Sequence, residues 1–244
     1  MSKFVLAMLL VLSYSFTAEA RPNKGMPAVH EDRILYISGV ITSSTLAPVQ
    51  KALENWSTSG DRRDITLVIS SPGGEVTSGT RFINQMKQAQ SVGIEFNCYV
   101  LDMAASMAFQ ILTHCDTRHS MDTSYLLWHG VRVGLMFAIV TQEVAQAMYL
   151  DLRRFNDTIT AQLRSALSLP DRDIRKHFLA ETLWSGKQLA DADPGFITAR
   201  RAYPEIHKKL GSAVKSATRG GMFGPGDYIY IWRRYMPVMA EDNK

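Results

Sequence analysis

Several features that define large functional classes are missing from this chain of 244 residues. It contains no glycine-rich phosphate loop ending in Gly-Lys-Ser/Thr, so we do not expect the chain itself to hydrolyse ATP. Charged residues make up 20% of the sequence and the net charge is +4, a modest excess that gives no reason to expect a nucleic-acid partner. No internal repeat or extended low-complexity segment is evident. With 46% hydrophobic residues, the composition is that of an ordinary globular domain.

Long apolar runs are also missing, apart from one at the start of the chain. Lys3 precedes the apolar run 4–12, and a polar stretch then ends in the A-x-A sequence of residues 18–20. The run is too short to cross a bilayer comfortably, and this order of segments is typical of a cleavable secretory signal peptide. We therefore predict a signal peptide over residues 1–20 and export of the mature chain, which would be periplasmic or secreted. An uncleaved N-terminal anchor is the alternative.

Cysteine is scarce, with only Cys98 and Cys115. In an oxidising compartment two cysteines can form one disulfide, but both could equally be buried small hydrophobic residues. Cys115 also lies in the run His114-Cys115-Asp116 with His119 close by. This spacing is not a recognised zinc pattern, so we predict no metal site.

The apolar pattern predicts alternating strands and helices. The run 65–70 is almost wholly apolar and rich in β-branched residues, as in a parallel strand covered on both faces. Repeating strand and helix units imply right-handed crossovers and ligands at the carboxyl ends of the strands. The predicted strands are 33–41, 65–70 and 94–101, and the predicted helices are 43–56, 77–90 and 141–167.

Residues suited to acyl-transfer chemistry follow several of these strands. Ser106 lies between small residues at a predicted helix start, and His129 ends a later predicted strand. A serine hydroxyl becomes a good nucleophile when an imidazole accepts its proton. Gly73 and Gly74 could present bare N–H groups to a developing oxyanion. Taken singly, Ser106 could be a helix N-cap, His129 a half-buried strand histidine, and the glycines an ordinary turn.

Three motifs in this order carry a family resemblance. Residues 71–74 read SPGG, residues 104–109 read AASMAF, and residues 127–129 read LWH. From about Asp32 to Thr198 the chain resembles the proteolytic subunit of the Clp protease, a serine peptidase of the Clp/crotonase superfamily. The resemblance implies an α/β fold, a Clp/crotonase-type spiral of βαβ units with a mainly parallel sheet and a long handle helix.

The same resemblance implies roles for individual residues. Ser106 would be the nucleophile and His129 the base, the N–H groups of Gly73 and Met107 would hold the oxyanion, and no cofactor would be needed. At the third triad position the sequence departs from the family. Counting back without gaps from Trp184-Ser185 places His177 where the family has an aspartate.

The acidic residues near His177 keep this third position open. Asp173 is the reserve candidate, and Asp171 and Glu181 lie within one or two helical turns. A neutral imidazole stabilises an imidazolium far less than a carboxylate does. The triad is therefore Ser-His-His with His177, which we favour by position, or a carboxylate shifted by a turn takes over, or the site is weakened.

The helix predicted over 141–167 carries an apolar stripe. In the family this is the handle helix through which rings pack together, so the resemblance implies a homo-oligomer. Packing onto the chain's own domain would give the same stripe. The apolar segment 130–140 could be a strand lining a substrate groove, or an interface. The stripe consists of Val144, Met148, Leu152, Phe155, Ile159 and Leu163.

These observations predict a peptidase domain over residues 21–199 and a basic C-terminal extension over 200–244. Within the extension, residues 220–226 suggest a hinge and 228–232 an edge strand. We expect an exported serine endopeptidase that cuts short or unfolded polypeptides, with no ATPase partner that can be inferred. The alternatives are a crotonase-like acyl-CoA enzyme, a catalytically weakened pseudoprotease that forms rings or binds peptides, and a Ser/Lys dyad.

Overall fold

The computed structural model describes residue 27 and residues 29–134 and 140–200. Its centre is a seven-stranded sheet in which β1, β2, β3, β4 and β7 are neighbours in that order. β5 pairs with the far end of β3, and β6 pairs with β5 in the only antiparallel pairing of the described sheet. The strands are β1 (Ile34–Ser38), β2 (Ile65–Ser71), β3 (Phe96–Ala105), β4 (Thr117–Ser120), β5 (Tyr125–Leu127), β6 (Leu183–Ser185) and β7 (Ala199–Arg200).

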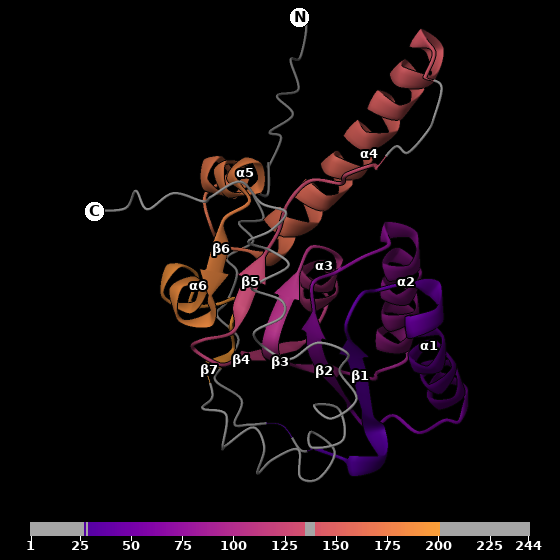
Figure 1. Cartoon of the computed structure of the whole chain (residues 1–244). Helices are drawn as coiled ribbons and strands as arrows, with labels where there is room; N and C mark the ends of the chain where they lie inside the picture. Colours follow the sequence, from indigo (N-terminus) through magenta and orange to yellow (C-terminus); the bar gives the residue numbers. More distant parts are fainter. Residues whose placement is uncertain (1–26, 28, 135–139, 201–244) are drawn as a thin grey trace, which may run out of the picture.

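Helices connect these strands and confirm the predicted α/β class with a mainly parallel sheet. Figure 1 shows α1 and α2 at the indigo side of the sheet and the orange α5 and α6 at the other side. None of the helices in the described residues is long and apolar enough to span a membrane. The helices are α1 (Ser43–Thr58), α2 (Val76–Ser91), α3 (Met107–Thr113), α4 (Gln142–Ala166), α5 (Asp171–Ala180) and α6 (Gly186–Ala192), with a 3-10 turn at Glu31–Arg33.

β3 is the strand that positions the site. It extends to Ala105, four residues beyond the predicted end, and almost all of its side chains are buried. Residues 97–100 pair with β4, whereas residues 103–105 pair with β5. Because the sheet divides along β3, the carboxyl ends of β2, β3 and β5 come together, and the segments that follow them meet there.

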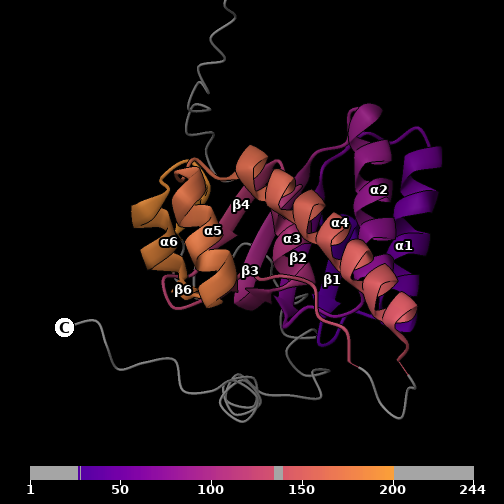
Figure 2. The ribbon, with the colours of Figure 1, turned by 90° about the horizontal axis from the view of Figure 1, so that it is seen from above.

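The long helix α4 is covered along only part of its length. It has 25 residues and contacts α3 and α5 near its C-terminal end, where Ile159 and Leu163 are buried. Its other end extends away from the sheet (Figure 1), and Figure 2 shows its oblique course above α3. Val144 and Phe155 of the predicted stripe are exposed, so packing within the described chain accounts for only part of the stripe.

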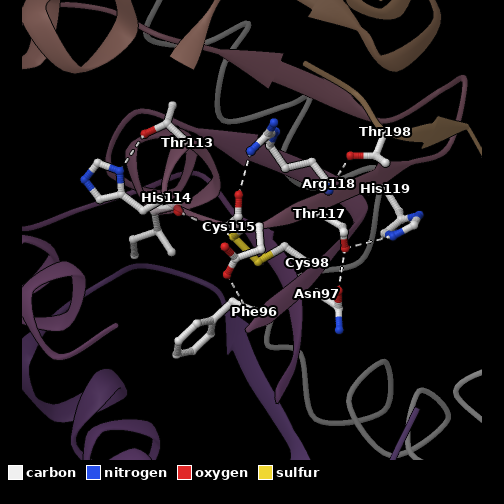
Figure 3. Close-up of a disulfide and its surroundings, with 12 residues drawn as sticks. Phe96, Asn97, Cys98, Thr113, His114, Cys115, Thr117, Arg118, His119 and Thr198 are labelled. Atoms are coloured by element: carbon white, nitrogen blue, oxygen red, sulfur yellow. Dashed lines mark hydrogen bonds between the residues drawn. A yellow bond between two sulfur atoms is a disulfide. The ribbon is translucent and has the colours of Figure 1, made fainter. Parts of the chain in front are cut away.

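The two cysteines form a disulfide, which settles the alternatives left open by the sequence (Figure 3). It joins Cys98 in the middle of β3 to Cys115 just after α3, and both residues are buried. The carboxylate of Asp116 accepts hydrogen bonds from the Phe96 N–H and from Gln90 beside it. The disulfide therefore closes a loop that contains the end of β3, Ser106 and all of α3.

The predicted signal peptide and nearly all of the C-terminal extension lie outside the described residues, and so does 135–139 of the segment 130–140. Residues 130–134 form no strand.

Candidate active site

Ser106 lies at the junction between β3 and α3 in an unusual backbone conformation. Its φ is +55° and its ψ is −122°, and its N–H donates to the Leu127 carbonyl at 2.9 Å. It occupies the N-cap position of α3, but its side chain makes no capping hydrogen bond. In the described residues, Ser106 and Glu181 are the two non-glycine residues with positive φ. Such strained conformations tend to cluster at functional sites, and the backbone here holds the hydroxyl out of its ordinary capping role.

The glycine turn after β2 packs directly against this junction. Gly73 has a φ of +93°, and a Cβ built on it would lie 2.6 Å from the Cβ of Ser106 and 2.8 Å from the amide nitrogen of Met107. Gly74 is equally close to Ile41, where an added Cβ would lie 2.1 Å from the carbonyl oxygen. An ordinary turn does not require its backbone to lie so close to neighbouring segments. These glycines are needed because no side chain fits between the turn and its neighbours.

The N–H groups of Gly73 and Met107 therefore belong to the same small region beside Ser106. As the first residue of α3, Met107 has no acceptor for its N–H within the helix. The N–H of Gly73 donates to Oγ of Ser71 at 3.1 Å. An incoming oxyanion would have to replace this hydroxyl as the acceptor for Gly73.

His129 follows β5 and is half-buried. Its Nδ1–H donates to the carbonyl of Gly130 at 2.6 Å, which leaves Nε2 as the basic nitrogen. Burial lowers the pKa of His129 below its usual 6.5, and the cation of Arg132 lowers this pKa further. The hydrogen bond to Gly130 and the carboxylate of Glu181 act in the opposite direction. The imidazole is thus held neutral near pH 7.

Ser106 and His129 line the same cavity of about 180 Å³. No hydrogen bond between the two side chains is present in the described structure. Catalytic hydrogen bonds are often long or absent before substrate binds. The lining residues are Gly74, Val76, Ser106, Met107, Gln110, His129, Gly130, Val131, Arg132 and Ile159.

His177 lies in α5 and is committed to other partners. Its Nδ1 is 2.8 Å from the hydroxyl of Thr182, and its ring packs edge-on against Trp184 with centroids 4.7 Å apart. Burial lowers its pKa, with Lys176 adding to this effect and Asp173 opposing it. The described residues contain no hydrogen bond or ring contact between His177 and His129.

Glu181 is the acidic group that acts on His129. It follows α5 in the left-handed conformation, with a φ of +52°, and its carboxylate pairs with Arg132. Counting residues back from Trp184-Ser185 did not single out Glu181, because its role depends on the turn after α5, from which its side chain reaches Arg132 in the segment after β5. Asp173, the reserve candidate, is near Arg172 and acts on the pKa of His177.

Comparison with known proteins supports the family resemblance found in the sequence. The family model described as Clp protease matches residues 18–180, which is more than half of the chain. The chain therefore belongs to the Clp protease family, and this membership supports a serine-peptidase type of function in general.

One curated relative illustrates the distance within the family. The chain is 26% identical over 210 residues to the ATP-dependent Clp protease proteolytic subunit 3 of the chloroplast of Arabidopsis thaliana. The aligned region covers 77% of this chain and 65% of that protein, so the chain spans somewhat less than two thirds of its relative.

Proposed function

We propose that this protein is a serine endopeptidase in which Ser106 attacks the carbonyl carbon of a peptide bond. The observation that carries the proposal is the contact between the Gly73 turn and the Ser106–Met107 junction, in a cavity that His129 also lines. This arrangement supports Ser106 as the nucleophile, His129 as the base and two backbone N–H groups as the oxyanion donors. Attack by Oγ would develop negative charge on the carbonyl oxygen, where the N–H groups of Gly73 and Met107 would stabilise it.

His129 would carry the proton in both directions. Because Nδ1 donates to the Gly130 carbonyl, Nε2 is the atom available to accept the Ser106 proton. It would return this proton to the leaving amine when the peptide bond breaks, which leaves an acyl-enzyme that water hydrolyses by the reverse sequence. A lowered pKa keeps His129 in the basic form at neutral pH.

For the third member we favour Glu181 over His177. Its charge raises the pKa of His129, as expected for the group that stabilises the imidazolium during the reaction. His177 instead contacts Thr182 and Trp184. In the present arrangement Glu181 pairs with Arg132, and His129 is oriented by a backbone carbonyl. The proposed reaction therefore needs a side-chain rearrangement in which Glu181 moves from Arg132 towards His129.

The substrates we propose are short or unfolded polypeptides. The phosphate loop is absent from the sequence, so the chain has no means of its own to unfold a protein with ATP. Export is supported by the charged and apolar pattern of residues 1–20 and by the disulfide, since disulfides persist in oxidising compartments.

Assembly into a homo-oligomer is part of the same proposal. The exposed part of α4 carries several large apolar side chains, among them Tyr149, Leu150 and Phe155. Apolar side chains grouped on an exposed surface often mark an interaction site. Light scattering during size exclusion tests this point. We expect the mature protein to elute as an oligomer and Phe155→Glu to dissociate it, whereas Arg153→Glu on the same helix should not.

Labelling with a fluorophosphonate probe tests the chemistry. We expect the probe to label Ser106 in the folded mature protein. Ser106→Ala should abolish the labelling and should lower the rate of cleavage of a fluorogenic peptide by about 10³-fold or more. Ser165→Ala, an exposed serine on α4, is the matched control and should retain both. Undiminished cleavage by Ser106→Ala would contradict the proposal.

A non-catalytic peptide-binding protein is the second candidate. The observation that favours it is that Glu181 pairs with Arg132 rather than with His129. On this alternative the folded protein would bind peptides, and the probe would fail to label Ser106.

A further inference from the structure

Gln110 is a buried polar residue that the proposed chemistry does not use. It lies one helical turn after Ser106, and its N–H donates to the Ser106 carbonyl at 3.1 Å. The residue is only 3% exposed, and its side-chain Oε1 is buried with no hydrogen-bond partner among the described residues. Leaving a buried amide oxygen unpaired is costly, so most such groups in folded proteins have a partner.

Gln110 also lines the cavity that contains Ser106 and His129. Away from the reacting groups, the same wall is made largely of the apolar residues Val76, Val131 and Ile159. Gln110 therefore places a neutral carboxamide next to the apolar part of the wall, and the cation of Arg132 also lines the cavity. Rotation about the last side-chain bond exchanges its oxygen and nitrogen, so it can offer the cavity either an acceptor or a donor.

The position of the cavity indicates which part of a substrate would enter it. The side chain on the acyl side of the scissile bond is attached one atom away from the carbonyl carbon that Ser106 would attack. It must therefore lie close to Ser106. A cavity of about 180 Å³ has room for one such side chain, since an apolar cavity of about 150 Å³ can hold benzene.

We infer that this cavity selects a substrate residue with a neutral carboxamide, namely glutamine, on the acyl side of the cleaved bond, through paired hydrogen bonds to Gln110. This inference rests on the proposed function, because it assigns the substrate preference of the same site. The CH₂ groups of a glutamine contact the apolar wall while its carboxamide both donates to and accepts from that of Gln110. Leucine, of similar size, leaves Gln110 unpaired. Glutamate offers no donor and brings a charge against these apolar residues, and Arg132, the cation that lines the cavity, is already paired with Glu181.

A binding experiment on the mature full-length chain tests this without requiring catalysis. The Ser106→Ala protein is titrated against fluorescently labelled peptides of one sequence that end, with a free carboxylate, in glutamine, leucine or glutamate. Binding is followed by fluorescence anisotropy. We expect the glutamine peptide to bind about tenfold more tightly than the leucine peptide, as befits hydrogen bonds formed in an apolar site. The glutamate peptide should bind more weakly than the glutamine peptide.

Variants of Gln110 complete the test as a double-mutant cycle, in which each change in Gln110 is combined with each change in the last residue of the peptide. In the Ser106→Ala background, Gln110→Leu and Gln110→Met both remove the carboxamide while filling its volume. Each should abolish the preference for glutamine and bind the leucine peptide at least as tightly. Thermal unfolding of each variant serves as the check that it is folded.

The outcomes separate this inference from the proposed peptidase activity. If the glutamine preference is present and depends on Gln110 while the probe fails to label Ser106, the selectivity stands and the peptidase proposal fails. Equal binding of the three peptides, a preference that survives Gln110→Leu and Gln110→Met, or no binding of any peptide would overturn the inference. Tightest binding of the glutamate peptide would also overturn it, because Arg132 rather than Gln110 would then be selecting the side chain.

Discussion

Arg132 and Glu181 form an ion pair beside His129, although 49 residues separate them in the sequence. Arg132 comes from the segment after β5 and lines the cavity, while Glu181 comes from the turn after α5. Their charges act on the pKa of His129 in opposite directions. Because the two side chains also bind each other, a change in one alters both influences on the imidazole.

This relationship predicts opposite pH shifts for two conservative variants. The base must be neutral, so kcat/KM should rise with pH through the pKa of His129 in the free protein. Arg132→Gln removes a cation that lowers this pKa and frees Glu181, so the acid limb should move to higher pH. Glu181→Gln removes an anion that raises it and frees Arg132, so the limb should move to lower pH.

Rates distinguish Glu181 from the residues near it. Glu181→Gln should also lower kcat/KM at its pH optimum by about 10²-fold. This is less than the loss of about 10⁴-fold in a protease whose histidine depends wholly on its aspartate, because the Gly130 carbonyl still orients His129. Asp173→Asn is the matched control and should stay within about twofold of the wild type. A larger loss in His177→Phe would make His177 the third member, and a larger loss in Asp173→Asn would make Asp173 the third member.

The glycine turn offers a second test, because the chain contains a matched pair of glycines. Gly73 and Gly93 have the same φ of +93°, but an added Cβ on Gly93 has nothing within 4 Å, whereas one on Gly73 would collide with Ser106. Both alanine variants should lose about 1 to 2 kcal/mol of unfolding free energy for the left-handed conformation. Gly73→Ala alone should also lose about 10²-fold or more in kcat, since the clash would displace the N–H that we propose as an oxyanion donor.

Urea unfolding and peptide cleavage measured on the two variants check this prediction. Equal activities of Gly73→Ala and Gly93→Ala would contradict it, because the turn would then serve only to change chain direction.

The sequence allowed the main elements to be predicted because their signals are local. The run 65–70 is almost wholly apolar and forms most of β2, and the stripe over 141–167 lies on α4. The end of β3 was placed too early, since Asp102 interrupts the apolar pattern and is accommodated by a hydrogen bond from Ser70. Periodicity also could not tell which part of the α4 stripe would be covered, because that depends on where α3 and α5 lie.

The parts of the site that escaped prediction depend on contacts between distant segments. Gln110 looks like an ordinary helix residue, and its missing partner becomes evident only once the surrounding wall is known. Glu181 was one of several acids near His177, and only the left-handed turn after α5 distinguishes it. The close approach of Gly73 to Ser106 could be proposed through the family motif, but not from the spacing of the two residues.

The disulfide should contribute substantially to stability. It closes a 17-residue separation between Cys98 and Cys115, and loops of this size restrict the unfolded chain by about 3 kcal/mol. We expect Cys98→Ala combined with Cys115→Ala to lower the unfolding free energy by about 2 to 4 kcal/mol. Urea unfolding with and without a reductant measures this. The reductant should destabilise the wild type and leave the double variant unchanged, and a wild type insensitive to it would contradict the prediction.

Stability towards acid should depend on His114, at the end of α3. Burial lowers its pKa from 6.5 to about 4, and the charge of Lys87 acts in the same direction. The unfolded chain therefore binds a proton near pH 6.5, while the folded chain binds it only near pH 4. Between these values the unfolded state carries more protons than the folded state, so the free energy of unfolding should fall as the pH drops from about 6.5 to 4. Above pH 6.5 the contribution of the neutral His114 to stability is complete.

A variant that cannot titrate isolates this contribution. His114→Gln should flatten the dependence of the urea midpoint on pH between 6.5 and 4, whatever its stability at pH 7. Some slope should remain, because the pKa of His129 is lowered as well and contributes with the same sign. Lys87→Gln keeps His114 but removes the cation, which raises the folded-state pKa towards 6.5 and should give an intermediate slope. A His114→Gln profile parallel to that of the wild type would mean that the folded protein already accommodates the imidazolium, for instance by exposing the end of α3.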